Sequence, residues 1–292
     1  MKKTKATLWQ AYTLTASLHW RGTKNEDHVV GIMASILLSL GKDYPVENIT
    51  GPVVQALVAQ WKQKGLSGST VNRKLAALGK VLRTAHQAGM RSSPPPTGLR
   101  LREGKGRRRI VTLEEVDLMT ADMRNRGLQE TPALVEFLYH TGMRVGEALA
   151  LKEGDVHLGD VLTSPYALVR DSKSGEPRTV PLTRPAVEAV RPFVGRSAWA
   201  VFNLTGTPDS QGYFNVEWNR SKFNVGLHTD AEFVPHALRH TCATNLVKAG
   251  VPISVVQKWL GHKSVTTTQR YAHVNDQQLK DAAKALEGMQ QR

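Results

Sequence analysis

The sequence is poor in residues that build covalent cross-links or membrane spans. Cys242 is the only cysteine among 292 residues, so neither an intrachain disulfide nor a cysteine-based zinc site can form. The longest apolar stretch, residues 29–40, is broken by glycine and serine and is too short to cross a bilayer. It follows two acidic residues, which does not fit a signal peptide. We therefore expect a cytoplasmic protein with no membrane partner.

Acidic residues are scarce in the first third of the chain. Residues 1–110 contain 19 of the 39 lysines and arginines but only 5 acidic residues, whereas residues 111–292 carry 20 of each sign. The whole net charge of +14 therefore belongs to the first 110 residues. Such a concentrated excess predicts a surface that binds a polyanion, either nucleic acid or an anionic membrane.

The first 90 residues show the periodicity of helices, which we expect at 7–19, 26–40, 52–64 and 71–87. The last of these has an apolar stripe, and polar residues lie off it. Those polar residues are either a solvated face or a face presented to a DNA groove, and the regional charge favours DNA. The residues of the stripe are Val71, Leu75, Leu78, Leu82 and Ala85, and the candidate DNA-contacting residues are Asn72, Arg73, Lys80 and Arg83.

Residues 91–109 combine three prolines, three glycines and seven basic residues, which excludes a regular helix or strand. We therefore predict a helical domain at 1–88, a basic linker at 89–109 and a second domain at 110–292. Phosphate attracts the linker, so Arg107, Arg108 and Arg109 are candidate DNA contacts. The second domain mixes helix and strand, with a capping box at Thr112 and Glu115, a hairpin over 167–182 and helices from residue 235 onward.

Four short segments of the second domain carry residue types suited to catalysis. They supply Arg144 after a glycine turn, Lys173 at the hairpin tip, the pair His236 and Arg239 on one helix face, and His262 followed by Tyr271. Each of these residues taken alone has an ordinary structural explanation. His236 and His240 are spaced to bind zinc, but position 237 is alanine, so the H-E-x-x-H pattern with its built-in base is missing and we expect no metal.

Taken together, the segments resemble the tyrosine recombinase family of phage integrases and their chromosomal relatives. The family's constellation is Arg, Lys, His-x-x-Arg, His and a Tyr nine residues after the last His, and this sequence matches all six positions. The stretch 69–75 also resembles the last helix of the family's core-binding domain. The resemblance implies an all-α core-binding domain followed by a mixed α+β catalytic domain, mainly helical with a small antiparallel sheet.

The resemblance also implies roles for these residues. Arg144, Arg239 and His262 would donate hydrogen bonds to the scissile phosphate, where positioning and electrostatics dominate phosphoryl transfer. Tyr271 would attack as the nucleophile, with His236 as the family's base and Lys173 as its general acid. The 3′-phosphotyrosine intermediate stores the energy of the broken bond, so no ATP, metal or other cofactor is expected. The sequence also lacks a G-x-x-x-x-G-K-[ST] loop.

We therefore expect a site-specific DNA recombinase, an integrase of a phage or mobile element, acting on double-stranded DNA in the bacterial cytoplasm near the nucleoid. The alternatives are a chromosomal or transposon resolvase of the same chemistry and a non-catalytic DNA-binding regulator that kept the fold. The family implies a homotetramer on two DNA sites, in some cases with accessory DNA-bending proteins. An apolar face at 279–286 fits either packing on a neighbouring subunit or docking on its own subunit.

Overall fold

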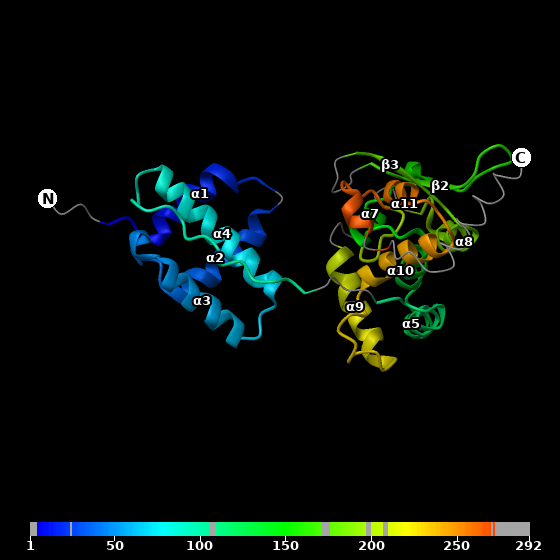
Figure 1. The fold of residues 1–292 in the computed structure, drawn as a ribbon. Helices are drawn as coiled ribbons and strands as arrows, with labels where there is room; N and C mark the ends of the chain where they lie inside the picture. The colour runs from blue at the N-terminus through cyan, green and yellow to red at the C-terminus, as the bar shows by residue number, and fades with distance from the viewer. Residues whose placement is uncertain are drawn as a thin grey trace, which may run out of the picture. The chain divides into compact units, whose positions relative to one another are not determined.

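The computed structural model describes residues 5–23, 25–104, 109–170, 176–196, 200–206, 210–269 and 271. The chain forms two compact units, Met1–Gly106 and Arg107–Arg292 (Figure 1). Each unit has its own apolar core. Within the described residues, no helix is both long and apolar enough to cross a membrane.

The described part of the first unit is helical. A capping box between Thr7 and Gln10 starts the first helix, and the Ser67 side chain caps the fourth. The fourth helix is central, because it packs against each of the other three. The elements are α1 (Leu8–His19), α2 (Glu26–Leu40), the 3₁₀ turn η1 (Val46–Asn48), α3 (Gly51–Gln63) and α4 (Gly68–Gln87).

The segment that follows α4, which the sequence predicts to be part of a basic linker, packs against the first unit. It has no regular secondary structure from residue 91 to 104, yet Met90, Leu99 and Leu101 pack against the core of the first unit. Asn72 holds this segment in place. Its amide nitrogen donates to the Leu101 carbonyl at 2.9 Å, and its amide oxygen accepts from the Leu101 N–H at 2.8 Å. Residues 89–104 therefore belong to the first unit.

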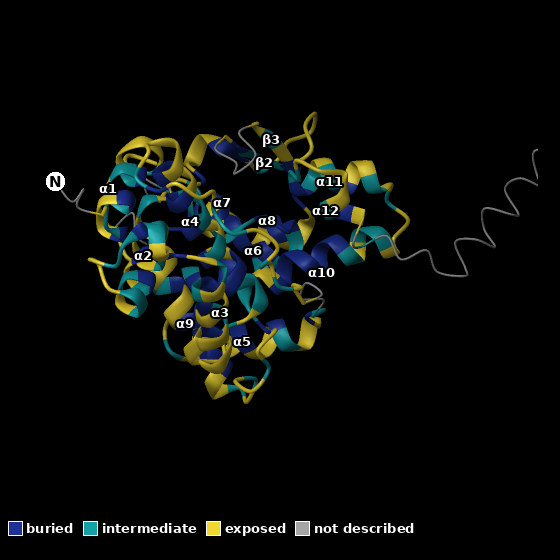
Figure 2. Ribbon diagram, turned by 60° about the vertical axis from the view of Figure 1, so that its left-hand side comes forward, coloured by how far each residue is buried: buried dark blue, intermediate teal, exposed yellow. Residues whose placement is uncertain are grey.

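The second unit is mainly helical with one small sheet. Its helix α6 lies at the centre and packs against α5, α8 and α10. The ribbon of α10 is largely in the dark blue of buried residues (Figure 2). The described elements are α5 (Leu113–Asn125), α6 (Glu130–Thr141), α7 (Val145–Leu149), η2 (Glu153–Asp155), β1 (Val156–His157), β2 (Tyr166–Val169), β3 (Arg178–Pro181), α8 (Arg184–Val190), η3 (Arg191–Phe193), α9 (Ser210–Asn224), α10 (Pro235–Lys248), α11 (Ile253–Leu260) and α12 (Val265–Gln269).

The sheet is antiparallel in the order β1-β2-β3, with Ala167 opposite Val180 in the β2–β3 pair. Both of these residues are buried, so one face of the hairpin packs on the core. The predicted hairpin and the Thr112–Glu115 capping box are confirmed. The two-residue strand β1 and the helix α9 were not expected from the sequence.

Candidate active site

The loop between α6 and α7 places the first arginine. Gly142 ends α6 in the left-handed conformation, with φ 65°, and this conformation favours glycine. Arg144 then caps α7, and its backbone N–H donates to Glu147 Oε2 at 2.9 Å. The Arg144 side chain also donates to Glu147 Oε1 at 2.5 Å. The side chain keeps 27% of its surface exposed, so its guanidinium is accessible to a phosphate.

The second arginine is held by backbone carbonyls. Arg239 lies on α10, is 2% exposed, and donates to the carbonyls of Gly142, at 2.8 Å, and Leu260. These bonds join the α6–α7 turn to the end of α11. Burial, followed by the positive charge of Arg144, lowers the pKa of Arg239 to about 10. The guanidinium therefore stays charged at neutral pH.

Glu147 is the buried carboxylate of the site. It accepts hydrogen bonds from Arg144 and from Arg178 at the start of β3. Burial alone would raise its pKa, but the hydrogen bonds from Arg178 and Arg144 and their two positive charges lower the pKa below its ordinary value. Glu147 is therefore an anion that both arginines share.

The predicted nucleophile lies beside the histidines of α10. Tyr271 packs against the small apolar cluster of Ala243, Val256 and Leu260, and its hydroxyl is hydrogen-bonded to Nδ1 of His240. The rings of His240 and His236 meet edge to face, with centroids 4.7 Å apart. His240 thus contacts the phenol, and His236, the base expected from the sequence, lies directly against His240. Both histidines are close enough to belong to one site.

His262 is oriented by a buried hydroxyl. It follows Gly261, which ends α11 with φ 66°, and its Nδ1 lies 2.9 Å from Oγ1 of Thr268. Thr268 has no exposed surface. A groove of about 900 Å³ opens beside His262 between β3 and α11. This contact fixes the orientation of the His262 ring.

The structure thus brings together five of the six predicted catalytic residues through α10, the α6–α7 turn and the end of α11. The sixth, Lys173, lies outside the described residues, as do Arg107 and Arg108. Sequence reasoning missed Arg178 and Thr268 and considered His240 only as a zinc ligand. An available signal for Arg178 was its spacing of two from the buried Val180, which puts a charged residue on the inward face of a strand.

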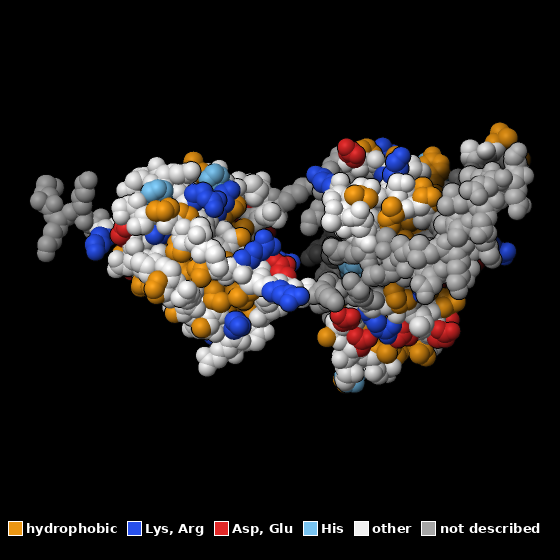
Figure 3. All heavy atoms as spheres, viewed as in Figure 1, with side chains coloured by type: hydrophobic (Ala, Val, Ile, Leu, Met, Phe, Trp, Pro, Cys, Tyr) orange, Lys and Arg blue, Asp and Glu red, His pale blue; other side chains and the backbone are white. Residues whose placement is uncertain are grey.

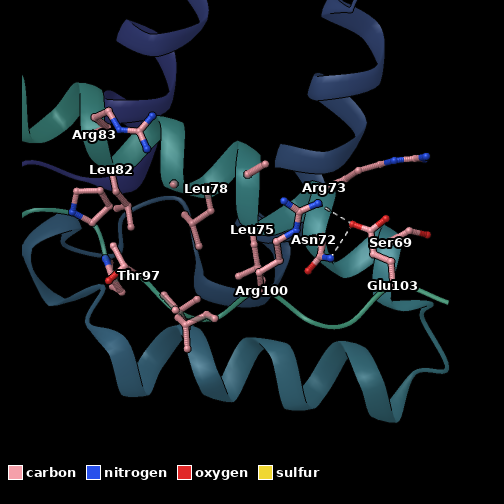
Figure 4. A pocket seen from close by; sticks show the side chains of 17 residues that line it. Ser69, Asn72, Arg73, Leu75, Leu78, Leu82, Arg83, Thr97, Arg100 and Glu103 are labelled. Carbon is pink, nitrogen blue, oxygen red and sulfur yellow. Dashed lines mark hydrogen bonds and ion pairs between the residues drawn. The ribbon is translucent and has the colours of Figure 1, made fainter. Parts of the chain in front are cut away.

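The predicted DNA contacts divide into two groups. Arg73 and Arg83 are exposed, and both come from α4 (Figure 4). Lys80 on the same helix is half-buried. Asn72 is 8% exposed and bonds Leu101 and Glu103, which gives it a structural role that the sequence analysis did not foresee. Arg109 has a similar role in the second unit.

The guanidinium of Arg109 is used within its own unit. Its Nε donates to Asp230 at 2.8 Å, its Nη2 pairs with Glu115, and it lies 5.4 Å from the centroid of the Phe233 ring. Hydrogen bonding to Glu115, against the effect of burial, raises the pKa of Arg109. The side chain ties the start of the second unit to α5 rather than presenting a free charge.

Comparison with known proteins identifies the family. Residues 109–278 match the model of the Phage integrase family. The chain is 32% identical over 240 residues to the tyrosine recombinase XerD of Corynebacterium glutamicum, covering 75% of each protein. It is 30% identical over 254 residues to XerD of Halalkalibacterium halodurans, covering 80% of each.

Solved structures share the fold. The lambda integrase tetramer bound to a Holliday junction matches with a TM-score of 0.75 at 22% identity, covering 94% of this chain and 80% of that one. The Tn1549 transposon integrase in complex with circular intermediate DNA matches with a TM-score of 0.74 at 19% identity, covering 95% and 99%. The family match over more than half of the chain and the identity to XerD establish that the chain belongs to the phage integrase family and is a tyrosine recombinase.

Proposed function

We propose that this site-specific DNA recombinase acts as the integrase of a phage or other mobile element, and that Tyr271 is its nucleophile. The observation that carries the proposal is the position of the Tyr271 hydroxyl against His240, on the same helix that supplies Arg239. A phenol is mostly protonated at neutral pH and needs a neighbouring base. One α-helix thus supplies both the base and a phosphate-binding cation.

The proposed reaction is a transesterification. The Tyr271 oxygen bonds to phosphorus, the bond from phosphorus to the 5′ oxygen breaks, and the phenol proton passes to the His240–His236 pair. Arg144, Arg239 and His262 stabilise the charge on the nonbridging oxygens. Lys173 protonates the leaving 5′ oxygen. A 5′ hydroxyl of another strand then reverses the steps, so the number of phosphodiester bonds is conserved without ATP or metal.

The proposed DNA contacts outside the candidate active site come from the first unit. Lysines and arginines are visible on the drawn face of the first unit, whereas carboxylates gather near α5 and α9 of the second (Figure 3). Arg73, Lys80 and Arg83 supply phosphate or base contacts from α4. We propose assembly as a homotetramer on two DNA sites, because strand exchange needs a pair of cleaved duplexes. The C-terminal face at 279–286 lies outside the described residues.

Covalent trapping tests this function. The purified chain is incubated with DNA fragments that flank its own coding region, and the mixture is denatured and separated by gel electrophoresis. We expect an adduct whose peptide carries DNA on Tyr271, and Tyr271→Phe should bind DNA but form none. An adduct formed by the phenylalanine variant would contradict the assignment of the nucleophile.

The identity of the trapped DNA fragment distinguishes the three candidate functions. An integrase should react with DNA next to its own gene. A chromosomal resolvase, the second candidate, should react with a site elsewhere in the chromosome. A non-catalytic regulator would retain DNA without any covalent product.

A further inference from the structure

Arg178 is a partly buried arginine that no step of the proposed reaction uses. It opens β3, its side chain is 9% exposed, and its Nη2 donates to Glu147 Oε2 at 2.6 Å. Its Nη1 reaches Glu147 Oε1 at 3.2 Å, which makes the pair bidentate. Its Nε donates to the Trp259 carbonyl at 3.1 Å. Three donors of the Arg178 guanidinium are therefore bonded to Glu147 on α7 and Trp259 on α11.

The surroundings leave Arg178 little freedom. Gly261 lies against it so closely that a Cβ on this glycine would come within 2.9 Å of three Arg178 side-chain atoms. Trp259, whose carbonyl Arg178 bonds, donates its own Nε1–H to the Thr141 carbonyl at 2.8 Å. The strand β3, which follows residue 173 in the chain, is thus tied through Arg178 to α7 and to the end of α11.

Arg144 and Arg178 compete for one carboxylate. Each Glu147 oxygen accepts from both residues: Oε1 from the two side chains, and Oε2 from the Arg144 backbone and the Arg178 side chain. If Arg178 were absent, the whole negative charge of a buried Glu147 would act on Arg144. A guanidinium neutralised in this way binds a phosphate less strongly, because the carboxylate screens its charge at short range.

We propose that Arg178 is a positioning residue for catalysis, which shares the charge of Glu147 and so keeps the guanidinium of Arg144 available for the scissile phosphate. In this role Arg178 does not contact the substrate and acts only through Glu147. The inference rests on the proposed role of Arg144 in binding the phosphate.

The test compares Arg178→Gln with the unmodified full-length protein on two DNA substrates. One carries the ordinary scissile phosphodiester in the site found by covalent trapping, and the other carries an uncharged methylphosphonate there. Loss of one direct preorganised donor costs about 10²–10³ in rate, so an indirect loss should slow adduct formation on the phosphodiester by roughly 10- to 100-fold. On the methylphosphonate, which lacks the charge that Arg144 must neutralise, the two proteins should differ by less than about 3-fold.

Three further variants separate the effect of charge from an effect on folding. Arg126→Gln removes another arginine that is bonded to two carboxylates, Asp122 and Glu217, and it should lose stability without slowing adduct formation on either substrate. Adding Glu147→Gln to Arg178→Gln removes the unshared negative charge and should recover at least about 5-fold of the lost rate. Arg178→Lys keeps the charge with fewer donors and should be intermediate, which provides a readout if the glutamine variant does not fold.

Equal slowing by Arg178→Gln on both substrates would mean a purely structural role and would overturn the inference. An unchanged rate on the phosphodiester would overturn it as well. Absence of an adduct with the unmodified protein would instead count against the proposed function, so the two failures are distinguishable.

Discussion

Replacing Gly142 by alanine should lower the stability of the second unit through two separable effects, backbone strain and overpacking. The residue has φ 65°, and a Cβ there would lie 2.9 Å from Cys242 Sγ and 3.2 Å from Leu260 Cδ2. The left-handed backbone costs a residue with a Cβ about 1–2 kcal/mol. Forcing an extra methyl group into a packed interior costs about 1–3 kcal/mol more. We therefore expect the free energy of unfolding of this unit to fall by about 3 kcal/mol.

Gly250→Ala is the matched control for the backbone effect. Gly250 has φ 80°, but nothing lies within 4 Å of its added Cβ, so only the conformational cost applies. For a unit of this size each kcal/mol shifts Tm by about 2–4 °C, so we expect losses of about 6–12 °C for Gly142→Ala and about 2–8 °C for the control. Scanning calorimetry of the full-length variants measures both. Equal losses in the two variants would refute the packing argument.

Three other predictions concern the chemistry and the DNA contacts. Lys173→Ala should slow cleavage of ordinary DNA far more than cleavage of DNA with a 5′-thio leaving group, since a thiolate leaves without a proton; equal slowing would remove its assignment as the acid. Adduct formation should survive EDTA, and a strict requirement for Mg²⁺ or Zn²⁺ would contradict charge neutralisation by arginine. Arg73→Ala should reduce the slope of the logarithm of the DNA-binding constant against the logarithm of salt concentration by up to about 0.9. Arg109→Ala should leave this slope unchanged, because the Arg109 guanidinium is already paired with Glu115 and Asp230. It should instead lower the free energy of unfolding by about 1–3 kcal/mol.

The parts of the fold that the sequence predicted are those with local signals. The helix over Glu26–Leu40 has the predicted bounds because acidic residues start it and Gly41 follows it. The Thr112 capping box lies within four residues of chain. By contrast, α9 has few apolar residues in periodic positions, and the strand β1 has two residues, so neither carries a pattern that a local reading can detect.

The parts of the site that the sequence missed depend on contacts between distant residues. The amide of Asn72 meets Leu101, 29 residues away, and Arg178 meets Glu147 across 31 residues. His240 reaches Tyr271 across 31 residues and only through the packing of α10 on α11. Composition and spacing identify residue types fit for phosphate chemistry, but the partner of each side chain is set by tertiary packing.

The main-chain hydrogen bonds of Arg239 affect which substitutions the second unit can accept nearby. Its two acceptors at Gly142 and Leu260 are main-chain carbonyls, which every amino acid supplies, so substitution of a neighbouring side chain does not remove them. Leu260 can therefore be exchanged for another apolar residue of similar volume without loss of the acceptor. Carbonyl dipoles also orient the guanidinium without cancelling its charge, unlike the carboxylate that holds Arg144. Homologous chains should accordingly vary at position 260 more freely than at position 147, where one specific anion is required, or at position 142, where the backbone conformation favours glycine.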